Sequence, residues 1–242
     1  MEQIYTIPVH EAFEAGAADP ACGCPMCALY RRLEENELDM ILGASMMEPD
    51  IRIQTNKEGF CRTHYDMMFV RKNRLGMALT LESHLNELKK DLKAGLLSSV
   101  TGRPGDRPKK RIAALEDSCY VCRKIDFHFT HMAETVILLF ESEPEFETLL
   151  RAQPYFCLPH YRLLLQAGED ALAKKKAAEL AAILSSVEEK YLNELSSDVS
   201  WFCKKFDYRF DGEPWGNAKD SVERAIRFLR SDLHRAPGKD GK

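Results

Sequence analysis

The sequence predicts an all-α protein with two duplicated zinc-knuckle helical lobes, followed by a long helix and a final packing helix. Three observations lead to this prediction. Apolar side chains recur at helical spacing along most of the chain, strand signals are nearly absent, and a pattern of cysteine and histidine residues occurs twice. With 242 residues, the chain is long enough to bury a sizeable core.

The composition is that of an ordinary soluble globular protein, with 45% hydrophobic and 30% charged residues. A net charge of -4 gives no general attraction to nucleic acid or to anionic membranes. The N-terminal residues show no secretory signal, and no apolar run approaches the roughly 20 residues that span a bilayer. We therefore expect a cytoplasmic protein without membrane association, in which the cysteine thiols stay reduced.

The first lobe is predicted to occupy residues 1–97. Pro25 suits the first position of a helix, and Asn56 with Gly59 would end a short one. Leucine side chains at helical spacing then mark a longer helix. The expected helices are Pro8–Ala15, Pro25 to about Leu42, Glu48–Gln54, one that begins near Cys61, and about Arg74–Leu96, with Leu81, Leu85, Leu88 and Leu92 as its apolar stripe.

Two prolines and two glycines within Ser98–Pro108 predict a linker over residues 98–109. The second lobe, residues 110–167, repeats the layout of the first: a cysteine pair, a helix to about Phe140, an acidic turn with proline, and a short helix. The acidic turn itself recurs, because Glu48-Pro49-Asp50 returns as Glu143-Pro144-Glu145. This order of features indicates a duplicated unit.

Residues 168–235 are predicted to form the long helix and the last helix. A turn at Gly168 would lead into a helix over about Glu169–Phe206, whose apolar side chains keep helical spacing over many turns. Asn217 would cap the last helix. Its inward face is expected to consist of Val222, Ile226, Leu229 and Leu233. The tail, residues 236–242, is expected to be disordered.

The repeated cysteine and histidine pattern is the most informative feature of the chain. A Cys-x-x-Cys pair, followed later by Phe-Cys-x-x-His, occurs in both copies, offset by 95 residues for the first pair and 96 for the second. Three thiolates and one imidazole are a common ligand set of structural zinc. The eight candidate ligands are Cys24, Cys27, Cys61 and His64 in the first copy, and Cys119, Cys122, Cys157 and His160 in the second.

We expect each copy to close its own site, so that the chain binds two Zn2+ ions. A helix of about 18 residues rises roughly 27 Å, and the remaining residues of each copy are long enough to return. Four protein ligands close a zinc site, whereas catalytic zinc keeps a position for water. A structural role is therefore favoured for both ions.

Other interpretations of these cysteines remain open. Buried thiols also behave as small hydrophobic side chains, and iron–sulfur clusters more usually use four cysteines. Cys24-Pro25-Met26-Cys27 resembles a thioredoxin-like redox pair but lacks the expected strand–helix–strand setting.

Residues outside the duplicated pattern receive weaker predictions. Cys22 has no counterpart in the second copy and is interpreted as a spare thiol. His128 and His131 are expected to be surface or packing residues, because the repeat does not support them as ligands. Cys203 is expected to be buried on the long helix.

The segment from Trp201 to Asn217 has the highest density of aromatic and charged residues in the chain. Its cations and aromatic rings form a candidate surface for an anion, a stacked base or a partner. In the alternative interpretation, the rings lock the last helix in place while the cations extend to water. The candidate residues are Lys204, Lys205, Tyr208, Arg209 and Trp215.

Several motifs together resemble a family of uncharacterised bacterial proteins that is catalogued only as a domain of unknown function. These motifs are Cys-Pro-x-Cys, Met-Met-Glu-Pro-Asp, Gly-Phe-Cys-x-x-His, Lys-Phe-Asp-Tyr-Arg and Pro-Trp-Gly-Asn. The resemblance covers nearly the whole chain and implies no particular activity.

The sequence contains no nucleophile elbow, phosphate-binding glycine loop or HExxH helix. We therefore predict a zinc-binding structural, interaction or regulatory protein that is not an enzyme and whose partner is an unknown protein. One alternative is a nucleic-acid-binding protein that uses the surface from Lys204 to Trp215. The other is a thiol redox or metal sensor.

Overall fold

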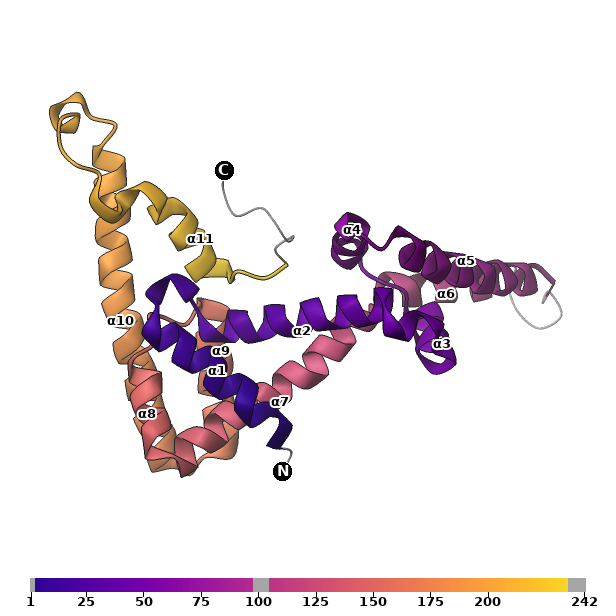
Figure 1. The fold of residues 1–242 in the computed structure, drawn as a ribbon, viewed down its shortest axis with the longest axis horizontal. Coiled ribbons are helices and arrows are strands. Elements are labelled where there is room, and N and C mark those ends of the chain that lie inside the picture. Colours follow the sequence, from indigo (N-terminus) through magenta and orange to yellow (C-terminus); the bar gives the residue numbers. More distant parts are fainter. Residues whose placement is uncertain (1–2, 98–104, 235–242) are drawn as a thin grey trace. The chain divides into compact units, whose positions relative to one another are not determined.

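The computed structural model describes residues 3–97 and 105–234, and this part of the chain contains helices and no strand (Figure 1). The predicted all-α fold class is confirmed. The chain divides into two compact units that alternate along the sequence. Unit 1 consists of residues 1–31 and 129–233, and unit 2 consists of residues 32–128 and 234–242.

Unit 1 is built around α10, which packs against α8, α9 and α11. Phe13 of α1 contacts Phe146 of α8 and Phe156 before α9, with ring centroids 5.0 and 6.1 Å apart. These three rings are fully buried and fill the core between α1, α8 and the start of α9. The helices that lie in this unit are α1 (Thr6–Ala18), α8 (Pro144–Arg151), α9 (Leu158–Ala171), α10 (Lys174–Lys204) and α11 (Ser221–Arg230).

Unit 2 is a smaller cluster of helices, in which α5 packs against α3, α4 and α6. Met67 and Met68 of α4 and Leu38 of α2 are buried in its core. Arg111 of α6 ties this cluster together, because it pairs with Asp91 and donates hydrogen bonds to backbone carbonyls at the end of α3. The helices that lie in this unit are α3 (Pro49–Glu58), α4 (Arg62–Val70), α5 (Arg74–Leu97) and α6 (Asp106–Glu116).

Two helices run through the division between the units. The first residues of α2 (Pro25–Leu42) belong to unit 1 and the rest to unit 2, whereas α7 (Tyr120–Ser142) begins in unit 2 and ends in unit 1. The predicted division into 1–97 and 110–167 therefore follows the sequence repeat, but the compact units do not. Each unit takes one half from each copy of the repeat.

Most helices of the first copy lie close to their predicted bounds, and α2 matches its prediction. The predicted linker 98–109 is only partly tested, since residues 98–104 lie outside the described residues. Asp106 to Lys109 already belong to α6, so this part of the prediction is wrong. The expected disordered tail, 236–242, also lies outside the described residues.

The single long helix predicted over Glu169–Phe206 is wrong. The chain remains helical through Gly168, which is buried in α9, and then breaks at Leu172 and Ala173, both with extended backbone. A Cβ on Gly168 would lie 2.6 Å from the side chain of Leu180, so the absence of a side chain permits close packing of α9 on α10. Glycine here serves helix packing instead of a turn.

Two further expectations about helix faces are wrong. Val222, Ile226 and Leu229 of α11 are exposed, and Phe228 is the large apolar side chain that this helix buries. In α5, the predicted stripe fails at Leu85, which is 59% exposed, whereas the buried face carries Met77, Thr80 and His84.

Candidate metal centres

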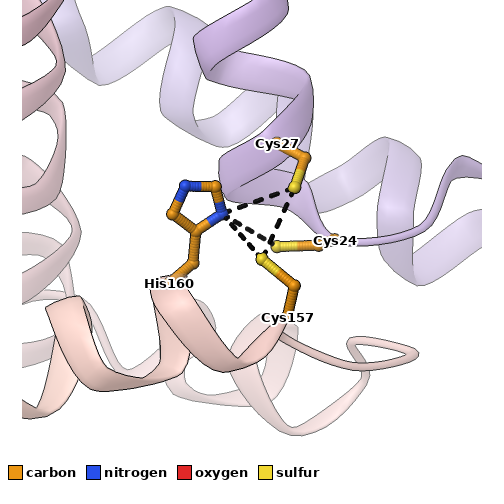
Figure 2. A group of neighbouring side chains, drawn as sticks. All are labelled: Cys24, Cys27, Cys157 and His160. Atoms are coloured by element: carbon orange, nitrogen blue, oxygen red, sulfur yellow. Dashed lines mark hydrogen bonds between the residues drawn. The ribbon is translucent and has the colours of Figure 1, made fainter. Parts of the chain in front are cut away.

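The eight predicted ligands come together in two groups of four. Centre 1 lies in unit 1 and consists of Cys24, Cys27, Cys157 and His160 (Figure 2). Centre 2 lies in unit 2 and consists of Cys61, His64, Cys119 and Cys122. In each group, one ligand atom per residue lies within 4.8 Å of all the others.

Each group combines one half of each repeat, so the prediction that each copy closes its own site is wrong. The Cys-x-x-Cys pair of the first copy meets the Cys-x-x-His pair of the second, and the reverse holds in the other centre. The helix lengths give the reason. With a rise of about 1.5 Å per residue, the part of α2 after Cys27 carries the chain roughly 22 Å away from that residue, whereas α3 runs only about 15 Å. The chain therefore reaches Cys61 before it can return.

Centre 1 begins at a sharp turn that presents both sulfur atoms of the first pair. Gly23 has a φ of 73°, a conformation that side chains disfavour. Cys24 follows directly, and α2 starts at Pro25, so Cys27 lies in the first turn of that helix. Cys157 is the N-cap residue of α9, and its carbonyl accepts the His160 N–H at 2.8 Å. His160 thus faces the sulfur atoms from the first turn of α9 (Figure 2).

Centre 2 has the same local construction. Cys61 is the N-cap residue of α4, and His64 lies in the first turn of that helix. Gly59 has a φ of 62°, and its carbonyl accepts the N–H of Tyr120, which lies between the two cysteines of the other pair. This backbone hydrogen bond of 3.0 Å holds the two ligand-bearing segments side by side.

The donor distances of both groups fit a tetrahedral ion. With Zn–S near 2.3 Å and Zn–N near 2.0–2.1 Å, sulfur atoms lie about 3.8 Å apart, and sulfur and nitrogen about 3.6 Å apart. In centre 1, the Sγ atoms of Cys27 and Cys157 are 3.6 Å apart, and the three sulfur atoms lie 3.1–3.6 Å from His160 Nδ1. In centre 2, Cys61 and Cys122 are 3.9 Å apart, and the sulfur–Nδ1 distances are 3.1–3.4 Å. Both groups could hold a metal ion.

The electrostatics of these groups also favour a cation. Hydrogen bonds from Cys157 and Cys24 lower the pKa of the Cys27 thiol, while burial raises the pKa of Cys24. In the other group, a hydrogen bond from Cys122 lowers the pKa of Cys119 to about 3. One thiol in each group therefore ionises most readily, and its charge makes the neighbouring thiols harder to ionise. A divalent cation would supply the charge that lets all three ionise.

The two histidines differ in what lies behind them. The Nε2 atom of His64 pairs with Glu34 Oε1 at 3.0 Å, and the same oxygen lies 2.6 Å from Nδ1 of His234. Burial acts to raise the pKa of Glu34, but the hydrogen bonds from His234 and His64 outweigh it and lower that pKa. Behind a metal ligand, a carboxylate fixes the orientation of the ring and increases its basicity.

In the repeat, position 129 is the counterpart of Glu34, with an offset of 95 residues, and it is a phenylalanine. Phe129 packs against the ring of His160 at a centroid distance of 5.3 Å. One histidine is therefore held by a carboxylate, and the other by an apolar ring. Sequence reasoning missed Glu34 and His234, because neither lies in the repeated motif. The repeat alignment already contained the contrast between Glu34 and Phe129.

Backbone and side-chain contacts further support centre 1. The N–H of Asp232 lies 3.5 Å from Cys27 Sγ, and the Asp232 carboxylate pairs with Arg31 at 2.7 Å. On the other side, the buried carboxylate of Glu188 accepts the N–H of Phe156, directly before Cys157, at 2.7 Å. These residues also escaped prediction, since nothing local in the sequence marks them as neighbours of the cysteines.

The candidate anion surface is only partly present. Lys205 is buried and its Nζ atom donates to the carbonyls of Phe210, Asp211 and Glu213, so its prediction as a surface cation is wrong. Arg209 pairs with Asp207 at 2.6 Å.

The remaining candidates of that segment are Lys204 and Tyr208, which are exposed, and Trp215, which is half-buried. The Lys205 ammonium lies 5.4 Å from the centre of the Trp215 ring, and the Trp201 indole N–H donates to the carbonyl of Pro214. Contacts of this kind favour the interpretation in which aromatic rings and a lysine hold the loop before α11 in place.

Three further predicted residues are placed by the structure. Cys22 is exposed and belongs to neither group. Cys203 is exposed, so its predicted burial is wrong. His131 pairs with Glu134 at 2.9 Å and its ring stacks on Tyr5, in agreement with a surface or packing role.

The comparisons with known proteins give one match. The match to DUF6062, a family of unknown function, covers residues 1–236. The chain belongs to this family. A search of curated proteins and a search of solved structures found no match. In the described residues, no helix has the length and apolar character required to cross a membrane.

Proposed function

We propose that the protein is a non-enzymatic zinc-binding protein whose two Cys3His centres hold its helices in a defined arrangement for interaction or regulation in the cytoplasm. The observation that carries this proposal is the grouping of eight donors into two four-ligand sets with tetrahedral spacing. Three sulfur donors and one imidazole favour zinc over magnesium or calcium, which prefer oxygen ligands.

A structural role is supported by the completeness of each set. Catalytic zinc centres usually have three protein ligands and an open position for water. Here each set offers three cysteines and one histidine, which fill the four positions of a tetrahedral ion, and all four residues of centre 1 are buried. We expect no hydrolytic activity from either ion.

Each ion would join segments that lie far apart in the sequence. Cys27 and Cys157 of centre 1 are 130 residues apart, and Cys61 and Cys122 of centre 2 are 61 residues apart. Structural zinc contributes apparent binding free energies of about 10–16 kcal/mol at neutral pH, and these act directly on folding. The ions would therefore stabilise both units. A protein partner is expected to bind to this metal-stabilised form.

The proposal is tested by metal analysis of protein purified without oxygen. We expect two zinc ions per chain, together with loss of helical circular dichroism and of the cooperative thermal transition after removal of zinc by a strong chelator. Addition of zinc should restore both signals. A metal content near zero in undenatured protein, or full stability after chelation, would contradict a structural zinc role.

A further inference from the structure

We infer that the two centres differ in exchange: centre 2 releases and takes up its thiophilic divalent cation readily, whereas centre 1 retains its ion. This inference rests on the proposed function, because it assumes that both centres bind zinc. It assigns to centre 2 the regulatory part of that function, namely response to a competing thiol or chelator.

The first observation is access to the sulfur atoms. In centre 1, all four ligand residues are buried. In centre 2, Cys61 and Cys122 are partly exposed, whereas His64 and Cys119 are buried. A competing ligand can therefore approach two sulfur atoms of centre 2 directly. At centre 1 it must wait for a local opening of the unit, which costs free energy.

The second observation is the environment of the two histidines. The Nε2 atom of His64 is hydrogen-bonded to the carboxylate of Glu34. The same carboxylate is hydrogen-bonded to His234, whose side chain is 38% exposed. The ring of His160 packs instead against Phe129, which is buried. Hydrogen-bonded partners behind a metal ligand change metal affinity by about 10–100-fold. Glu34 therefore strengthens the hold of centre 2 on its ion. The faster release from centre 2 is attributed to the access to Cys61 and Cys122, and loss of Glu34 should make that release faster still.

The test measures zinc release from the wild-type protein with two bound ions, in excess chelator at neutral pH, with a metal-sensitive dye. We expect two phases of equal amplitude that differ in rate by about tenfold or more. Cys61→Ser should remove the fast phase, and Cys24→Ser should remove the slow one. A single phase for both ions, or a fast phase that persists in Cys61→Ser, would overturn the inference.

A measurement on the wild-type protein covers the case in which these variants do not fold. Alkylation with N-ethylmaleimide, followed by peptide mass spectrometry, reports the order in which thiols react. Cys22 and Cys203 are exposed and should react first. Cys61 and Cys122 should follow, with loss of one zinc ion, before any thiol of centre 1. Reaction of Cys24, Cys27 or Cys157 at the same rate as Cys61 would contradict the inference.

The role of the carboxylate is tested with Glu34→Gln. We expect the fast phase to accelerate by about tenfold or more, with the slow phase unchanged. Glu35→Gln, at the neighbouring exposed position, is the matched control and should leave both phases unchanged. An unchanged fast phase in Glu34→Gln would show that Glu34 does not affect zinc release from centre 2.

These outcomes are distinguishable from failure of the proposed function. If wild-type protein holds fewer than two zinc ions, the zinc proposal itself fails. If it holds two that leave at one rate, only the difference between the centres is wrong.

Discussion

Two buried charged residues, Lys205 and Glu188, form hydrogen bonds to backbone groups of neighbouring segments. Their residue types alone do not predict this role. Lys205, a residue type that is usually exposed, donates to three backbone carbonyls beyond the end of α10. Glu188 of α10 accepts the N–H of Phe156, and its second oxygen, Oε2, is buried without a hydrogen-bond partner. Burial raises the pKa of Glu188 to about 7.

Glu188 leads to a prediction about pH. Because the pKa of Glu188 in the folded protein exceeds the ordinary value of 4.5, the folded state binds more protons between these values. Its contribution to stability therefore falls as the pH rises from about 4.5 to 7 and stays low above that range. Glu188→Gln keeps an acceptor for Phe156 and removes the charge. We expect the variant to gain on the order of 1 kcal/mol over wild type between pH 5 and pH 8.

The measurement is chemical denaturation at both pH values, with zinc in excess so that metal loss affects both proteins equally. Glu189→Gln changes the neighbouring exposed side chain and serves as the control, with no expected pH-dependent gain. A difference between wild type and Glu188→Gln that does not vary with pH would show that this carboxylate does not titrate in the range given.

At the level of elements, α11 shows why an apolar pattern does not identify the buried face of a helix. The buried residues of α11 are Ser221 and Phe228, and Arg224 is half-buried. Arg224 reaches Asp198 of α10 at 2.8 Å, and Phe228 lies 5.4 Å from the ring of Tyr191. The more apolar face carries Val222, Ile226 and Leu229, which are exposed.

We therefore expect two alanine substitutions in this helix to differ widely in their effect on stability. Phe228→Ala should destabilise unit 1 by about 3–5 kcal/mol, because it removes a ring that is only 2% exposed. Ile226→Ala should change stability by less than about 0.5 kcal/mol, because this side chain is 59% exposed. Thermal or chemical denaturation of the zinc-loaded variants measures both. Equal losses would show that Ile226 is buried after all.

At the level of the whole chain, the exchange of halves between the repeats is the principal structural result. It leads to a prediction that can be tested by counting the zinc ions bound per chain. Cys24→Ser combined with Cys157→Ser damages one centre and should leave one ion per chain. Cys24→Ser combined with Cys61→Ser damages both centres and should leave none. These counts follow from the grouping of the ligands.

Pairing within each repeat would give the reverse counts. The Cys24 and Cys61 double variant would then keep one ion, and the Cys24 and Cys157 variant would keep none. Cys22→Ser combined with Cys203→Ser is the control, because both thiols are exposed and lie outside the centres, so two ions should remain.

The helices were predictable because their signals are local. Proline at the start of α2, the glycine before Cys61, and apolar spacing act within a few residues, so most helix positions follow from nearby sequence. The break at Leu172 and the exposed face of α11 were not predictable, because they depend on which helices pack together.

The sequence by itself determined which residues belong to the candidate centres, because donor chemistry and the spacing of Cys-x-x-Cys and Cys-x-x-His are local properties that the duplication repeats. Only the tertiary structure decided which pairs meet, that Glu34 stands behind His64, and that Phe129 takes the equivalent place beside His160. The physical reason is the length of α2 and α7. Each helix carries the chain too far for the short helix that follows to return, so each pair of cysteines meets the half-site of the other copy.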